Sequence, residues 1–356
     1  MPTLYGKNIS RKELERHIGH ISQIAGVRLL ELTEGPEAGV RVADVRSGSG
    51  LRFQISLDRG MDVSLADYKG ASLAWRAPNG DVHPGYYNPR GLEWLRSFPG
   101  GLITGCGLTH LGAPCIDDGE ELGLHGRLSN TPAGEVKTET VWSGESCTFN
   151  ISGTVREGGL FKGNLALHRT FAVGLGESSF TLSDTVVNEG FQKSPFMILY
   201  HINLGWPLID DRAELLLNAR SMAPRDAEAT KGAATATKLS PPVAGFQEQV
   251  FFHELVADSA GLATALLQNS ELQLGLYVQF RQKELPRFIE WKMVGEGTYV
   301  FGLEPANCLV QGRAKERERG TLQFLEPGES RQTFLRVGVL DGDKALNQFK
   351  QEHHLK

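Results

Sequence analysis

The sequence predicts an all-β protein, built as a large antiparallel sandwich or barrel with one short helix near its start. Three observations indicate this class. Apolar and polar residues alternate with a period of two in many short segments. Turn residues, drawn from 42 glycines and 16 prolines, separate these segments. Few segments with helical spacing intervene, which argues against a parallel sheet with crossover helices.

The first expected element is a helix of about 14 residues that starts after Ser10. Ser10 followed by Glu13 forms a capping box. Apolar residues then recur at helical spacing, at Leu14, Ile18, Ile21 and Ile24. We therefore expect residues 1–27 to form an extension with a helix and residues 28–350 to form a single sandwich domain, because sandwiches often exceed 200 residues as one unit.

Alternation predicts strands over four segments, which are residues 51–57, 165–171, 272–280 and 333–339. Two other stretches look irregular. Residues 76–130 are rich in glycine and proline and long enough to suggest a binding role. Residues 222–246 are rich in alanine and threonine and are expected to form a mobile surface loop.

Arg59 occupies a position in the register of an apolar strand face. A buried arginine is costly unless it is paired. Either a bulge at Gly60 turns Arg59 outward, or the side chain points into a polar pocket. Its partner is then a nearby aspartate, Asp58 or Asp62, or a ligand.

Two later strands carry polar residues on otherwise apolar faces. Strand parity places His201 and Asn203 on one face of residues 196–207, where Trp206 follows, and this suggests a cavity lining. Glu304 ends the polar face of residues 298–305, where Pro305 is expected to stop the ladder. Without further information, His201 could instead be a structural residue that forms hydrogen bonds, and Glu304 could be a solvated residue at the rim of the sheet.

Glycines flank His125 and Arg127 in the segment Leu-Gly-Leu-His-Gly-Arg, so backbone could approach a ligand closely there. Cys106, His110, Cys115 and His125 lie within twenty residues and raise the possibility of a zinc site in the same region. Their spacing matches no familiar zinc pattern. No phosphate-binding loop, dinucleotide fingerprint or nucleophile elbow is present, so we expect neither a cofactor nor a metal.

Charge and composition limit the kinds of binding partner and the location that we expect. The formal net charge is -5, and the densest basic run, residues 313–319, is interrupted by acids, so nucleic acid is not expected and the run is expected to be a solvated loop or strand end. No long apolar stretch predicts a signal peptide or a membrane span. Four unpatterned cysteines fit reduced thiols, so the expected location is cytoplasmic. The sequence leaves monomer and homo-oligomer equally open.

Taken together, the segments around His125, His201 and Glu304 resemble the aldose 1-epimerase (galactose mutarotase-like) superfamily, and most closely its uncharacterised bacterial aldose-1-epimerase-like branch. The segments are Leu-His-Gly-Arg127, Tyr-His201-Ile-Asn-Leu-Gly-Trp-Pro and Gly-Leu-Glu304-Pro-Ala-Asn. The resemblance extends to the segments around Arg59 and Lys292, and so spans residues of about 40 to 345.

This resemblance implies a β-supersandwich and a cofactor-independent mutarotase that interconverts the α and β anomers of a sugar. It implies a catalytic set of His201 as the general acid and Glu304 as the general base, with His125 as a second histidine that orients the sugar or assists at the ring oxygen. Arg59 would contact hydroxyl groups. The segment before the first histidine departs from galactose mutarotases, so galactose is not implied as the substrate.

The other substrate-binding candidates are Arg127, Asn203, Trp206 and Lys292. Arg127 and Lys292 could receive an acidic or phosphorylated sugar. Two alternatives remain beside the mutarotase. One is a non-catalytic carbohydrate-binding or regulatory protein on the same fold, and the other is a sugar isomerase that removes a proton next to a carbonyl.

Overall fold

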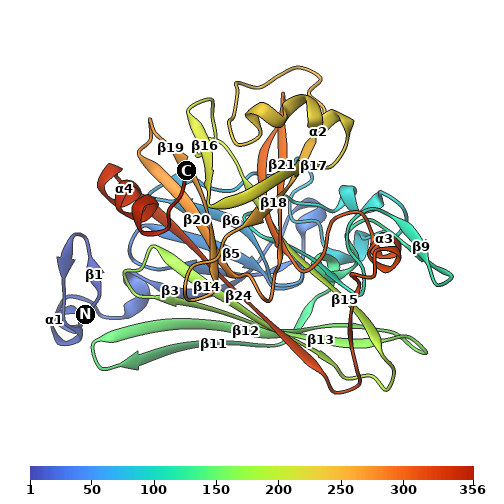
Figure 1. Cartoon of the computed structure of the whole chain (residues 1–356). Helices are drawn as coiled ribbons and strands as arrows, with labels where there is room; N and C mark the ends of the chain where they lie inside the picture. The colour runs from blue at the N-terminus through green and yellow to red at the C-terminus, as the bar shows by residue number, and fades with distance from the viewer.

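The computed structural model describes all residues, 1–356, and its main feature is a pair of large antiparallel sheets (Figure 1). The first, called the large sheet, has eight strands. In spatial order they are β11 (Ala133–Ser143), β12 (Ser146–Gly158), β13 (Asn164–Gly174), β14 (Ser179–Asn188), β24 (Ser330–Asp341), β20 (Leu274–Arg281), β19 (Leu262–Asn269) and β16 (Ala213–Leu217).

The second sheet, called the site sheet, has seven strands. In order they are β17 (Ala219–Pro224), β18 (Gln249–Leu255), β21 (Arg287–Gly295), β22 (Thr298–Ala306), β15 (Ser194–Leu204) and β23 (Gln323–Leu325), and β8 (Thr104–Leu108) also pairs with β15. All of these pairings are antiparallel.

A third sheet of five strands, the N-terminal sheet, comes first in the chain. It consists of β3 (Gly26–Glu31), β4 (Arg41–Arg46), β5 (Leu51–Ser56), β6 (Asp62–Tyr68) and β7 (Ala71–Ser72). Two small hairpins complete the strands, β1 (Thr3–Leu4) with β2 (Lys7–Asn8), and β9 (Cys115–Asp117) with β10 (Glu120–Leu122). The predicted all-β sandwich class is confirmed, and each of the four strands predicted from alternation coincides with β5, β13, β20 or β24.

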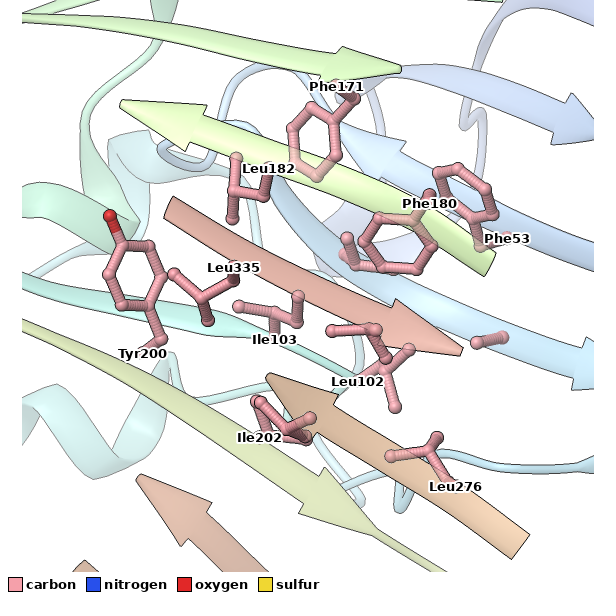
Figure 2. Close-up of a cluster of buried hydrophobic side chains, with 14 of the residues drawn as sticks. Phe53, Leu102, Ile103, Phe171, Phe180, Leu182, Tyr200, Ile202, Leu276 and Leu335 are labelled. Carbon is pink, nitrogen blue, oxygen red and sulfur yellow. The ribbon is translucent and has the colours of Figure 1, made fainter. Parts of the chain in front are cut away.

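The main hydrophobic core lies between the sheets. Figure 2 shows Phe171, Phe180 and Leu335 of the large sheet pointing toward Tyr200 and Ile202 of β15. These side chains are buried because alternate residues of each strand point to the same face. The site sheet therefore buries one face in the main core, and its other face is free to carry different residues.

A buried polar network fixes β15 against the large sheet from the core side. Asp184 on β14 accepts hydrogen bonds from Arg169 Nη2 on β13 at 2.7 Å and from the Tyr200 hydroxyl at 2.5 Å. Arg169 also donates to the carbonyl of Gly60 at 2.7 Å. Such a satisfied network holds one arrangement, because an unpaired group in the core is costly. Tyr200 immediately precedes His201, so the network also positions His201.

Four helices lie outside the sheets: α1 (Arg11–His17), α2 (Ala227–Gly232), α3 (Arg313–Glu318) and α4 (Asp343–Glu352). Ser10 Oγ caps α1 at the backbone NH of Glu13, as expected. The helix is half the predicted length, because Ile18 adopts an extended conformation and a separate 3-10 turn follows at Ile21–Gln23. Leu14 still packs into the main core. In Figure 1, α1 lies near the turn between β11 and β12, where the backbone NH of Arg11 donates to Glu145.

Two other sequence expectations are corrected by helices. Residues 222–246 contain α2 and a 3-10 turn rather than only a loop. Most of the basic run forms α3, and Arg313 is buried against Asp117 instead of solvated. No helix has the length and apolar character needed to cross a membrane.

Candidate active site

His201 and Glu304 face each other across two neighbouring strands. The β15–β22 ladder pairs Ile202 with Leu303 and Asn203 with Gly302, and this register sets His201 opposite Glu304. The distance from His201 Nε2 to Glu304 Oε1 is 3.2 Å. Because both side chains extend from paired strands, their spacing is fixed by the backbone ladder and does not depend on a loop.

The pair lies on the face of the site sheet opposite the main core. The neighbours of His201 along β15, Tyr200 and Ile202, belong to the main core. A second, smaller apolar cluster surrounds the pair on its own face, with members that include Leu199, Ile289 and Ala306. Both side chains are mostly buried, at 7% and 4% exposed. His201 Nε2 and the Glu304 oxygens nevertheless keep some solvent contact, unlike His201 Nδ1, which is fully buried.

The irregular segment of residues 76–130, called the covering segment, packs over this face. It carries an aromatic wall, since Phe98 lies 5.4 Å from His201 and Trp94 lies 4.8 Å from His125, measured between ring centroids. His125 stands nearly perpendicular to His201, at 5.9 Å and 87°. The structure thus brings His125, His201 and Glu304 together from segments distant in sequence.

Local backbone constraints explain the glycines beside His125. His125 has a φ of +57°, in the left-handed region, and Gly126 follows at +75°. A Cβ on Gly126 would lie 2.2 Å from the carbonyl oxygen of His110, and one on Gly123 would lie 2.0 Å from that of Pro89. Only glycine fits such contacts. The sequence suggested that backbone would approach a ligand here, but the glycines instead admit neighbouring backbone.

Trp291, Glu248 and Arg225 complete the opposite side of the site. Trp291 lies 5.2 Å from His201, ring centroid to ring centroid. Its indole Nε1 donates to Glu248 at 2.9 Å, and Arg225 Nη2 donates to the other oxygen of Glu248 at 2.9 Å. Sequence reasoning missed all three residues. Strand parity could have found Trp291, because it lies opposite Gly302 on the face that carries Glu304.

Burial shifts the pKa values of the two central groups in opposite directions. Removal from water raises the pKa of Glu304 to about 8, and Glu248 adds to this effect while Arg225 opposes it. Removal from water lowers the pKa of His201 to about 4. At neutral pH the pair therefore holds one proton, on the carboxyl group, and the imidazole is neutral. Burial and the neighbouring His201 and His110 also lower the pKa of His125.

Asn203 supports His201 instead of pointing freely toward a ligand. Its Nδ2 donates to the carbonyls of Gly101 and His201 at 3.0 and 2.9 Å. Its side chain also raises the pKa of His201 against the larger effect of burial. Asn203 Oδ1 and His201 Nδ1 are both buried without a hydrogen-bond partner. A neutral imidazole with its proton on Nδ1 has its basic nitrogen at Nε2, which lies 3.2 Å from Glu304 Oε1.

Arg59 does not reach the site as expected from the sequence. The side chain is buried, and its partners are the carbonyl oxygens of Val82 and Ser97 and the Oδ1 atom of Asn130. Neither Asp58 nor Asp62 pairs with it, because Asp58 binds Arg41 and Asp62 binds Arg169. All three Arg59 partners belong to the covering segment, so this arginine anchors that segment and its expected sugar contact is corrected.

Lys292 is also corrected as a substrate contact. It pairs with Phe301, which belongs to the main core, so it lies on the face of the site sheet away from Glu304. Its ammonium group donates to the carbonyls of Thr235 and Lys238 at 2.7 and 2.5 Å. Lys292 therefore holds the segment after α2 in place.

The last two predicted contacts remain exposed. Arg127 is exposed beside His125 and forms no ion pair, so its role stays a prediction. Trp206 follows the end of β15 and is 72% exposed, beyond the aromatic residues around His201. No group of three or more His, Cys, Asp or Glu side chains is arranged to hold a metal ion. All four cysteines are unpaired.

A sandwich of large antiparallel sheets with these features has the galactose mutarotase-like fold. The chain is similar to the crystal structure of "a putative aldose 1-epimerase" from Klebsiella pneumoniae, with a TM-score of 0.88 and 28% identity over 92% of this chain and 86% of that one. It also shares its fold with a galactose mutarotase-like protein from Clostridium acetobutylicum (TM-score 0.61, 11% identity, 90% and 99% covered). Galactose 1-epimerase from Lactobacillus acidophilus gives a TM-score of 0.57 at 14% identity, with 89% and 99% covered.

A match to a family model shows the family to which this chain belongs. The domain of unknown function DUF4432 matches residues 37–339, so the chain belongs to the DUF4432 family, an aldose-1-epimerase-like branch of this fold. No curated protein matches the chain.

Proposed function

We propose that the protein is an aldose 1-epimerase that interconverts the α and β anomers of a neutral sugar. The observation that carries this proposal is the contact of 3.2 Å between His201 Nε2 and Glu304 Oε1, in a site where their pKa values are shifted in opposite directions. Pairs of titratable groups with separated pKa values are typical of acid–base catalysis.

Mutarotation needs one proton donor and one proton acceptor near the anomeric carbon. The Glu304 carboxyl donates its proton to the ring oxygen as the bond from that oxygen to C1 breaks. His201 Nε2 accepts the proton of the anomeric hydroxyl as the C1 carbonyl forms. After rotation about the C1–C2 bond, the same transfers run in reverse and close the ring on the other face. The sugar and the pair regain their protons, so nothing is consumed.

The donor and acceptor are exchanged relative to the resemblance, which implied His201 as the acid and Glu304 as the base. The exchange follows from burial, because a desolvated carboxyl keeps its proton and a desolvated imidazole loses it. Transfer of the proton across the 3.2 Å contact converts one form into the other. The total of one proton on the pair is the same in both forms.

His125 has a supporting role in this proposal. Its ring is held by Trp94 and stands beside His201, and its lowered pKa keeps it neutral. A neutral imidazole offers a hydrogen bond to a sugar hydroxyl without adding a charge. We therefore assign it to orientation of the sugar.

The charges around the pair favour a neutral substrate over an acidic or phosphorylated one. Lys292 lies on the other face of the sheet and is already bonded to two carbonyls. Arg225 is paired with Asp226 and Glu248. Arg127, two residues from His125 in the chain, is an exposed cation. A phosphate group usually needs a stronger cluster of donors.

The test is a measurement of anomer exchange with a panel of neutral aldoses, sugar acids and sugar phosphates by NMR exchange spectroscopy. Catalysis of at least one neutral aldose above the buffer rate supports the proposal. Line broadening without faster exchange for every sugar would instead establish the non-catalytic binding protein. Deuterium from solvent on a sugar carbon would establish the isomerase, because mutarotation exchanges hydroxyl protons only.

A further inference from the structure

A groove with aromatic walls lies beyond the end of β15 and has no part in the acid–base chemistry. Trp75, Trp206 and Tyr299 are its aromatic residues, Arg76 is its one charged residue, and its volume is about 350 Å³. We call it the aromatic groove. Its size falls within the range of about 300 to 1,000 Å³ that small-molecule sites occupy.

The aromatic groove adjoins the candidate active site at Trp75. The backbone NH of Trp75 donates to the carbonyl of Asn203, two residues from His201 on β15. The Trp75 ring lies 6.1 Å from that of Phe98, and Phe98 lies 5.4 Å from His201. Trp75 thus belongs both to the aromatic wall around His201 and to the wall of the groove.

The chemistry of the aromatic groove fits a neutral ring with an apolar face. Arg76 is paired with Asp81 at 3.0 Å and with Glu37 at 3.4 Å, so its charge is compensated. The Tyr299 hydroxyl donates to the carbonyl of Ser240 at 2.5 Å, which fixes its ring. Trp206 is 72% exposed, a large apolar area left open to solvent. The CH face of a pyranose stacks on such rings while its hydroxyls stay in water.

We propose that the aromatic groove is a subsite for a second sugar ring, so that the preferred substrate is a neutral reducing disaccharide or longer oligosaccharide. This inference rests on the proposed function, because the reducing ring must occupy the space beside His201 and Glu304. The next ring then extends past Trp75 toward Trp206.

The test compares two matched pairs of sugars, cellobiose with glucose and lactose with galactose, in the wild type and in Trp206→Ala. We expect the substitution to lower kcat/KM for anomerisation of the disaccharide about 10-fold, mostly through KM, and to lower that for the monosaccharide much less. Trp206→Phe keeps an aromatic face and should retain most of the preference. Phe191→Ala is the matched control, since Phe191 is 98% exposed before the opposite end of β15.

An equal effect on both sugars of a pair, or no effect on either, would overturn the subsite. If no sugar is anomerised at all, the proposed function fails and the subsite is judged by binding. Saturation-transfer NMR with methyl cellobioside then provides the readout. A signal that is lost in Trp206→Ala and kept in Phe191→Ala supports the groove as a sugar site, whereas no signal in the wild type contradicts it.

Discussion

His201 and Glu304 form a directly opposed pair on adjacent antiparallel strands, with Nε2 and Oε1 separated by 3.2 Å. The backbone ladder sets this distance, and burial of both groups leaves a single proton on the pair at neutral pH.

Replacement of either member of the pair should remove most of the anomerisation. We expect Glu304→Gln and His201→Asn each to lower kcat by on the order of 10² to 10⁴, the usual contribution of one proton transfer. Both changes are close in shape, so folding should be retained, as checked by circular dichroism. The measurement is anomer exchange by NMR. Wild-type kcat in either variant would show that the assigned role is wrong.

The rate should depend on pH as a broad plateau. The single-proton form of the pair exists between the pKa of His201, about 4, and that of Glu304, about 8. Activity is expected to fall below the first value, as His201 gains a proton, and above the second, as Glu304 loses its proton. A pH series of kcat/KM, corrected for the uncatalysed reaction, measures the decrease in rate at acidic pH and the decrease at alkaline pH. In Glu304→Gln any residual rate should lack the alkaline limb.

Stability should show the cost of burying Glu304. Its pKa is raised in the folded protein, from an ordinary value of about 4.5 to about 8. Between these values the folded state holds a proton that the unfolded state has lost, so the free energy of unfolding decreases as pH rises through this window. Glu304→Gln has no carboxyl group at this position and therefore lacks this pH dependence. Urea denaturation at pH 5, 7 and 9 measures the free energy of unfolding of both proteins. The value for Glu304→Gln should rise relative to that of the wild type as pH increases. A difference that stays constant with pH would contradict a buried, protonated Glu304 carboxyl group.

Arg59 and Arg127 should behave differently, although both were expected to touch the sugar. Arg59→Met leaves the carbonyls of Val82 and Ser97 unpaired in the interior, which costs on the order of 3 kcal/mol of unfolding free energy. Arg127→Met, at an exposed position, should change stability by less than about 0.5 kcal/mol. Thermal and urea denaturation measure both. A stable Arg59→Met protein with a raised KM would restore a ligand contact for Arg59.

The sequence contained much of the fold because alternation marks strand faces. The parity of β15 placed His201 with Asn203 and separated them from Tyr200, as the structure shows. The same argument applied to β21 would have separated Lys292 from Glu304. The charge of Lys292 suggested a contact with an acidic sugar near Glu304, but the period of two in a strand puts the two residues on opposite faces.

Other parts of the site could not be predicted from local patterns. Glu248 just precedes β18 and Arg225 just follows β17, where no periodicity applies, and only the three-dimensional pairing with Trp291 brings them near Glu304. The length of α1 was overestimated because apolar spacing continues past Ile18 while the backbone becomes extended. Arg59 was expected to contact a ligand because its actual partners, the carbonyls of Val82 and Ser97, lie far along the chain and leave no local sequence pattern.

The anchoring of the covering segment by Arg59 links two parts of the chain that do not share a sheet. Arg59 follows β5 in the N-terminal sheet, and the side chain holds Val82, Ser97 and Asn130 at once. An event that unravels the first strands, such as a proteolytic nick, would therefore also loosen Phe98, which packs edge-on against His201. Order at the front of the chain and order in the candidate active site are thus coupled through one buried side chain.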